Sequence, residues 1–142
     1  MDKESTEYTL NDLEVGQKSS FSLKIAESMV SDFANLSGDN NPLHMNEEYA
    51  KTTKFGKRVC HGMLLASFFS KLVGMYLPGK NSLYFSQTLN FTLPCFVGDQ
   101  ITIEGQILDK SMASRIVTLK TTIHNQNGQC LVDGTAKVMV LK

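Results

Sequence analysis

The chain has 142 residues, 42% of them hydrophobic and 20% charged, which fits one globular domain and excludes a disordered protein. The 14 basic and 14 acidic residues give zero formal net charge, which excludes long-range attraction to nucleic acid or an anionic membrane. The 3 cysteines include no CxxC pair, so we expect free thiols in a cytoplasmic protein rather than disulfides or a zinc site. We predict one domain over residues 1–142, beginning with a polar, flexible tail at residues 1–9.

The first third of the chain predicts one strand and short helices. Apolar residues alternate with polar ones near residues 19–25, which is typical of a half-buried strand. Apolar residues then recur at spacings of three and four, which predicts an amphipathic helix that ends at Gly38. Residues 37–46 are rich in turn formers and should form a loop. A small helix should follow over about residues 47–53, with Asn46 as its N-cap.

The rest of the chain predicts a central helix and a sheet. Residues 62–77 are apolar on nearly every face, which indicates a helix buried on all sides, yet Ser67 and Lys71 make it too polar and short to span a membrane. Four antiparallel strands should follow, at about residues 83–93, 101–107, 117–123 and 130–141. The fold class is therefore α+β: one antiparallel sheet wrapped around a long central helix.

Asp39 and His44 are the first candidate catalytic residues. They lie on either side of Pro42 in a loop that can curl, so a carboxylate and an imidazole could hold one water between them. One group could remove a proton from that water while the other supplies or relays a proton. The alternative is structural: Asp39 caps a turn, Asn41 forms an Asx-turn before the proline, and His44 is a half-buried side chain.

Gly62 is the second candidate, because it begins the predicted central helix. A helix N-terminus offers unpaired N–H groups and a partial positive charge, and a glycine lets a substrate approach the backbone closely. A thioester carbonyl placed there would have its developing enolate stabilised as in an oxyanion hole. The alternatives are that Gly62 serves only tight packing and that the preceding His61 is a structural contact rather than a catalyst.

A cationic stretch over residues 51–58 is the third candidate. It holds four cations, among them Lys54 and Arg58, which could bind the phosphates of coenzyme A. The alternative is a solvated face. The sequence contains no P-loop, no GxGxxG and no metal-ligand spacing, so we expect no metal and no nucleotide-hydrolysing or redox chemistry.

These motifs together resemble those of a known family. Residues 32–44 contain a D-x-N-P-x-H pattern, and His61-Gly62-Met63, Leu77-Pro78-Gly79 and Phe96-Val97-Gly98-Asp99 follow. They are similar to the motifs of the MaoC-like (R)-specific enoyl-CoA hydratases, and the resemblance covers the chain from about residue 12 onward. It implies a hotdog fold, a homodimer with sheets joined edge to edge, and reversible syn hydration of trans-2-enoyl-CoA to (R)-3-hydroxyacyl-CoA. Many family members supply this product for polyhydroxyalkanoate synthesis.

The resemblance also implies roles for single residues. Asp39 and His44 would be the catalytic pair, and the Gly62 backbone N–H would polarise the thioester carbonyl. Ser70 stands where a serine supports the site in some relatives, and we expect Asn41 and Val73 near the substrate as well. The family's chemistry needs no cofactor, because coenzyme A is part of the substrate.

Three other functions are weighed against this one. A hotdog acyl-CoA thioesterase would need a carboxylate on the long helix, and residues 63–77 contain none. A dehydratase of acyl carrier protein-bound substrates would use the same chemistry on another carrier. A non-catalytic acyl-thioester binding module would not need both Asp39 and His44.

Overall fold

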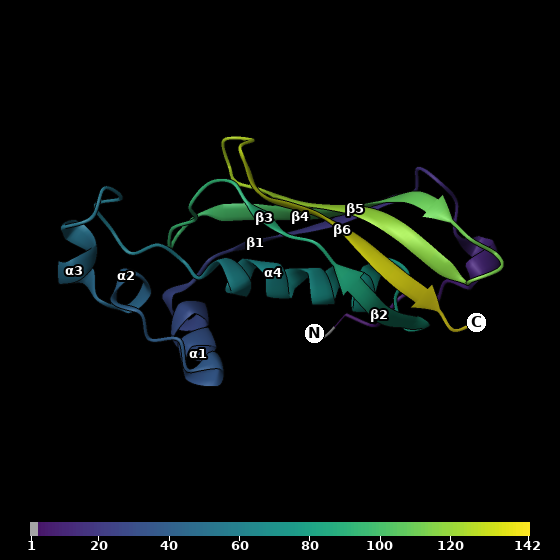
Figure 1. The fold of residues 1–142 in the computed structure, drawn as a ribbon, viewed down its shortest axis with the longest axis horizontal. Coiled ribbons are helices and arrows are strands. Elements are labelled where there is room, and N and C mark those ends of the chain that lie inside the picture. Colours follow the sequence, from purple (N-terminus) through teal and green to yellow (C-terminus); the bar gives the residue numbers. More distant parts are fainter. Residues whose placement is uncertain (1–2) are drawn as a thin grey trace.

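One antiparallel sheet forms the body of the molecule in the computed structural model, which describes residues 3–142 (Figure 1). The sheet has six strands, in the order β1-β4-β5-β6-β2, and the short β3 also pairs with β6. Their bounds are β1 (Lys18–Lys24), β2 (Ser82–Gln87), β3 (Asn90–Phe91), β4 (Gln100–Lys110), β5 (Ile116–His124) and β6 (Cys130–Val140). The α+β class is therefore as predicted.

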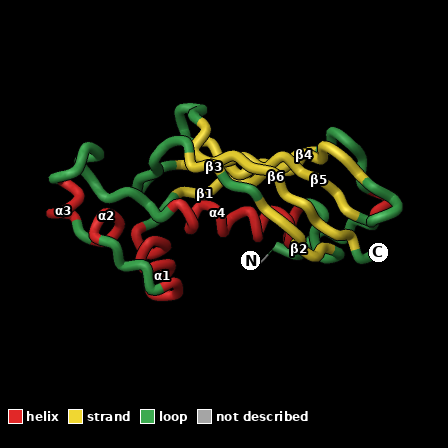
Figure 2. The backbone as a smooth tube through the Cα atoms, in the orientation of Figure 1, coloured by secondary structure: helices red, strands yellow, loops and turns green. Residues whose placement is uncertain are grey.

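Four α-helices and a short 3₁₀-helix (Leu10–Asp12) accompany the sheet within residues 3–142. The bounds of the α-helices are α1 (Glu27–Ser37), α2 (Pro42–Met45), α3 (Glu47–Lys51) and α4 (Gly62–Lys71), and α4 continues into a π-helical turn (Leu72–Tyr76). Figure 2 shows α4 lying along one face of the sheet, whereas α1, α2 and α3 gather at one end of the molecule. That end carries the residues of the proposed site.

The core lies between α4 and the sheet. In β4 and β5, alternate residues point toward the helix and are fully buried, as the predicted period of two requires. These inward residues include Ile101, Ile103, Ile107, Val117, Leu119 and Ile123. Ile101, Ile103 and Ile123 form one cluster with Leu65, Phe69 and Leu72 of the long helix and its continuation. Ile107, Val117 and Leu119 form a second cluster with Val73 and Leu77. Burial of this apolar surface stabilises the body.

The long helix is buried on one side rather than on all sides. Leu64, Leu65 and Phe69 are buried against the sheet, but Met63 is 57% exposed and Lys71 is exposed too. The prediction of burial all round was wrong because the sheet of a single chain covers only one face of α4. Apolar composition alone does not say how many neighbours a helix has.

The segment predicted as one strand at residues 83–93 is two strands, and four of its apolar side chains are exposed. Leu83, Phe85, Phe91 and Leu93 are between 43% and 63% exposed. The alternation does not mark one apolar face. Leu83 pairs with the half-buried Met139 of β6, whereas Phe91 pairs with the buried Val132 and lies against Gly62 at the start of α4. Leu83 and Phe85 are the exposed apolar side chains of β2.

The N-terminal residues are ordered where the sequence predicts a flexible tail. Glu7 forms a β-bridge with Gly79, and the Thr6 N–H donates to the carbonyl oxygen of Met75. Backbone hydrogen bonds to the turn after the long helix therefore hold this segment, although its composition is polar. Met1 and Asp2, part of the predicted tail, lie outside the described residues.

No helix within residues 3–142 is long and apolar enough to cross a membrane.

Candidate active site

The turn after α1 places Asp39. Gly38 ends α1 in the left-handed conformation (φ 81°), which glycine adopts without strain. Asp39 then donates its N–H to Ser37 Oγ (3.1 Å) and accepts the N–H of Asn41 at its Oδ1 atom (3.1 Å). The carboxylate is therefore exposed and uses one oxygen to shape the turn. Asp39 therefore caps a turn, as the structural alternative held, and its second carboxylate oxygen is left for a ligand.

His44 sits on a short helix that the sequence did not predict. Asn41 caps α2 by accepting the N–H of Leu43 at Oδ1 (3.0 Å), and Pro42 occupies the first turn. A side-chain cap and a proline whose backbone is already helical suffice to close one turn where composition predicts a loop. The turn brings His44 back toward Asp39.

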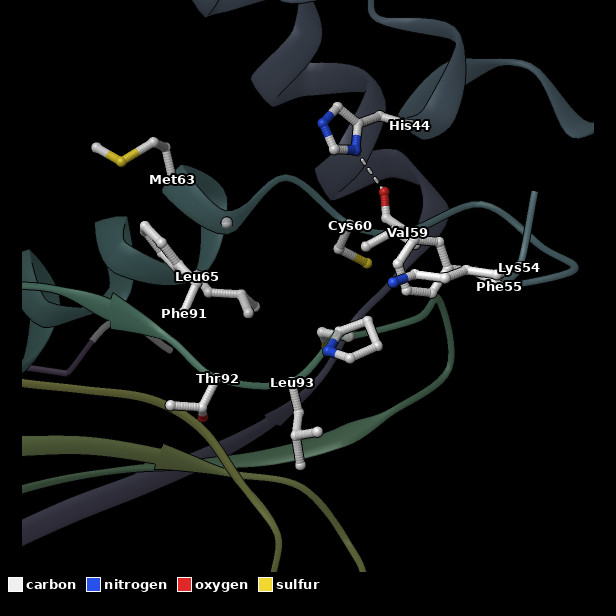
Figure 3. A pocket seen from close by; sticks show the side chains of 13 residues that line it. His44, Lys54, Phe55, Val59, Cys60, Met63, Leu65, Phe91, Thr92 and Leu93 are labelled. Atoms are coloured by element: carbon white, nitrogen blue, oxygen red, sulfur yellow. Dashed lines mark hydrogen bonds between the residues drawn. The ribbon is translucent and has the colours of Figure 1, made fainter. Parts of the chain in front are cut away.

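His44 is held by one contact to its ring and one to its main chain. Its Nδ1 atom lies 2.6 Å from the carbonyl oxygen of Val59, as Figure 3 shows. A carbonyl oxygen only accepts hydrogen bonds, so Nδ1 carries the hydrogen and Nε2 keeps a free lone pair. On the main chain, Arg58 Nε donates to the carbonyl oxygen of His44 (2.6 Å). In the neutral imidazole, the nitrogen that can accept a proton is thus Nε2.

A cavity of about 550 Å³ opens beside His44. His44 lies on one side of it, and Phe91, Thr92 and Leu93 lie on the other (Figure 3). The rest of its wall is mostly apolar: Lys54, Phe55, Val59, Cys60, Gly62, Met63, Leu65, Pro94 and Cys95. This volume and lining suit a small ligand with an apolar part and one polar reactive end.

Gly62 lies in the wall of the same cavity and is the first residue of α4. Its N–H has no acceptor within the helix, because the residue four positions earlier lies outside it. A Cβ atom at this position would lie 3.0 Å from ring atoms of Phe91, closer than most side-chain contacts. Glycine therefore keeps both the backbone and the adjacent space open.

Asp39, His44 and His61 form one cluster. One oxygen or nitrogen atom from each lies within 4.8 Å of the others. These atoms are of the kind that bind divalent cations, but the His44 and His61 rings lie nearly face to face, with planes 32° apart. Their lone pairs therefore do not converge well on one ion, and the absence of a metal stays a prediction.

The residues expected near the substrate divide into two groups. Lys54 lines the cavity, whereas Asn41 caps α2 and is not among the residues that line it. Arg58 is engaged elsewhere, since its Nη1 atom donates to Glu27 Oε1 (2.7 Å). Ser70 is exposed on α4 and Val73 is buried in the core, so neither contributes to the cavity.

Sequence reasoning missed two groups at this site. The Val59 carbonyl, which sets the tautomer of His44, belongs to the backbone, so no residue type signals it. Arg58 was read as a phosphate ligand because it stands among cations, but it holds the main chain of His44.

Two buried thiols, Cys60 and Cys95, also line the cavity. Their hydrogen bond and their burial raise the pKa of the Cys95 thiol far above its ordinary value. Cys95 is therefore a protonated apolar wall rather than a nucleophile. The prediction of free, mostly buried thiols is confirmed for the described residues.

Known proteins are similar to this chain in sequence. The model of the MaoC like domain matches residues 11–128. An (R)-specific enoyl-CoA hydratase from Aeromonas caviae is 48% identical over 126 residues, 89% of this chain and 94% of that protein. A mitochondrial 3-hydroxyacyl-[acyl-carrier-protein] dehydratase from Solanum lycopersicum is 33% identical over 138 residues, 96% of this chain and 82% of that protein.

Solved structures agree. An R-hydratase from Pseudomonas aeruginosa has a TM-score of 0.91 and 39% identity, covering 96% of this chain and 87% of that chain. The hotdog fold expected from the motifs is thereby confirmed.

Proposed function

This chain belongs to the MaoC-like family of hydro-lyases, and we propose that Asp39, His44 and Gly62 carry out its (R)-specific hydration of trans-2-enoyl-CoA. One observation carries the proposal. His44 is held in the tautomer whose free Nε2 can accept a proton, and it shares a cavity with the unpaired N–H of Gly62. A base and an oxyanion donor in one apolar cavity are what addition of water to an enoyl thioester requires.

The proposed reaction begins with a water held between Asp39 and His44. As its oxygen bonds to C3, His44 Nε2 takes one of its protons, and the electron pair of the double bond moves through C2 onto the thioester oxygen. The Gly62 N–H stabilises that enolate oxygen. When the carbonyl re-forms, the Asp39 and His44 pair delivers the proton taken from the water to C2. No metal or organic cofactor enters this sequence, and the reverse order of steps is dehydration.

The shared position of Asp39 and His44 bears on stereochemistry. Both groups lie on one short segment and reach one face of the enoyl plane, so hydroxyl and proton would add to the same face. Hydration in D₂O should give a syn relationship between C2 and C3. The product should be oxidised by an (R)-specific and not by an (S)-specific 3-hydroxyacyl-CoA dehydrogenase. An anti relationship would overturn the one-water mechanism even with an (R) product.

A direct assay separates this function from the rivals. With crotonyl-CoA, a hydratase lowers the enoyl absorbance and releases no free thiol, a thioesterase releases thiol, and a binding module does neither. A thioesterase is further disfavoured because no carboxylate stands on α4 or its continuation, residues 62–77. We expect loss of enoyl absorbance alone.

The carrier of the acyl group is a second question, because the tomato relative is named for carrier-protein substrates. Lys54 at the cavity wall supports recognition of a phosphate-bearing handle, which coenzyme A and the phosphopantetheine arm of a carrier protein both supply. We propose coenzyme A as the carrier. Comparison of kcat/KM for crotonyl-CoA and crotonyl-acyl carrier protein tests this, and a preference for the protein substrate would reverse the assignment.

A homodimer is part of the proposal. Edge strand β2 carries exposed Leu83 and Phe85, and Phe91 and Leu93 at the cavity are exposed as well. An open edge and exposed apolar side chains together are unfavourable in a monomer. Light scattering should give about twice the 15.8 kDa chain mass, and a mass near one chain would contradict the dimer. A cytoplasmic location also stays a proposal.

A further inference from the structure

His61 contacts the main chain of Asp39. It stands just before α4 and is 1% exposed. Its Nε2 atom lies 3.0 Å from the backbone carbonyl oxygen of Asp39, 22 positions earlier in the chain. Because a carbonyl oxygen only accepts, Nε2 carries the hydrogen and donates it. This bond ties the start of α4 to the turn that carries the carboxylate.

The ring of His61 also contacts the ring of His44. Their centroids lie 4.1 Å apart with the planes tilted by 32°. Phe33 of α1 approaches His61 edge-on, with a centroid distance of 4.9 Å. One buried side chain therefore touches both members of the proposed catalytic pair, and α1 supports it.

Packing alone does not account for a histidine at this position. The buried Nδ1 atom of His61 has no hydrogen-bond partner within residues 3–142. An unpaired buried polar atom lowers stability, and an aromatic hydrocarbon ring of similar shape would avoid that loss. A histidine at this position therefore gives the folded chain less stability than such a ring would. The feature it adds over that ring is the Nε2 donor.

We infer that His61 is a positioning residue, which holds the turn of Asp39 and the ring of His44 at the separation that the hydration step needs. The inference rests on the roles proposed for Asp39 and His44. His61 itself does not exchange a proton with the substrate, because its donor atom is occupied and its other nitrogen is buried. Misplacement of a catalytic group by about 1 Å costs on the order of 100-fold in rate.

The test compares two substitutions with opposite chemistry. His61→Phe keeps a ring against His44 but removes the donor, whereas His61→Gln keeps an amide N–H that can reach the Asp39 carbonyl. We expect His61→Phe to lower kcat for crotonyl-CoA by about 10- to 100-fold with a smaller change in KM. Its melting temperature should equal or exceed that of the wild type. His61→Gln should recover most of the lost kcat.

Two controls separate the possible outcomes. His124→Phe is the matched substitution at a histidine at the end of β5, outside the site, and it should leave kcat unchanged. Asp39→Asn is measured in parallel, and full turnover there would reject the proposed catalytic pair itself. If Asp39→Asn loses turnover while His61→Phe keeps it, only the inference on His61 fails. Equal losses of kcat and melting temperature in both His61 variants would show a structural role and overturn it too.

Discussion

Two regions of this molecule are held together by different forces. The body, meaning the sheet and α4, is stabilised by fully buried apolar side chains such as Ile103 and Leu119. The site segment, residues 37–61, has only three buried residues, Ala50, Cys60 and His61. Directional hydrogen bonds hold it instead, as between His44 and Val59.

The difference separates stability from catalysis. Apolar burial is large and non-directional, so it fixes the fold without aiming particular atoms. A hydrogen bond adds little net stability but sets distances and tautomers. Substitutions in the body, Gly62 excepted, should therefore change the free energy of unfolding and spare kcat, whereas substitutions in the site segment should do the reverse.

The largest effect should come from the proposed catalytic pair. Asp39→Asn and His44→Ala should each lower kcat for crotonyl-CoA by about 10²–10⁴-fold, the range for a lost general acid or base. Circular dichroism and the melting temperature should stay close to those of the wild type, because both residues are at least partly exposed. Near-normal turnover in either variant would remove that residue from the mechanism.

The converse substitution lies in the body. Leu119 is fully buried on β5, so Leu119→Ala should lower the free energy of unfolding by about 2–5 kcal/mol. Urea unfolding measures the loss. At 15 °C, where the variant is still folded, kcat should match the wild type. A large fall in kcat there would show that the two regions are coupled.

Substitutions of Arg58 and Lys54 test whether, within the site segment, Arg58 positions His44 and Lys54 binds the phosphates of the substrate. Arg58→Lys cannot bond to the His44 carbonyl and to Glu27 together, so kcat should fall about tenfold with any thioester. Lys54→Ala should instead raise KM for crotonyl-CoA and leave KM for crotonyl-N-acetylcysteamine, which has no phosphates, unchanged. If Arg58→Lys raised KM only with the coenzyme A substrate, the phosphate role first expected of Arg58 would be restored.

The smallest effect is a titration in the body. Burial raises the pKa of Tyr84 to about 12, against about 10 for an unfolded tyrosine. Between those pH values the folded chain keeps a proton that the unfolded chain has lost, so the free energy of unfolding falls as pH rises. Urea unfolding at pH 9, 10 and 11 should show a steeper fall in the wild type than in Tyr84→Phe. Parallel curves would contradict this.

The body was largely predictable from local patterns. Period-two alternation located β4 to β6, and Gly38 and Asn46 marked helix boundaries where the structure has them. What the patterns could not decide is which neighbours cover a surface. The outward apolar face of β2 and the open face of α4 depend on tertiary arrangement, or on another chain.

The site segment was predictable in part. Asp39 and His44 could be proposed because a carboxylate and an imidazole stand close together in one loop, and Gly62 because it begins a predicted helix. The contacts that orient them could not be, because the Val59 carbonyl has no side-chain signature. The long-range bond from His61 to Asp39 joins residues whose separation no local rule covers.

The base of the loop between His44 and Val59 has a consequence for how such enzymes diversify. Three hydrogen bonds close it: His44 Nδ1 to the Val59 carbonyl, the Val59 N–H to the Leu43 carbonyl, and Arg58 to the His44 carbonyl. The tip, with Lys54 and Phe55, can therefore be lengthened or exchanged while the imidazole stays in place. Recognition of the carrier and the chemistry on its acyl chain can evolve, or be engineered, as separate modules.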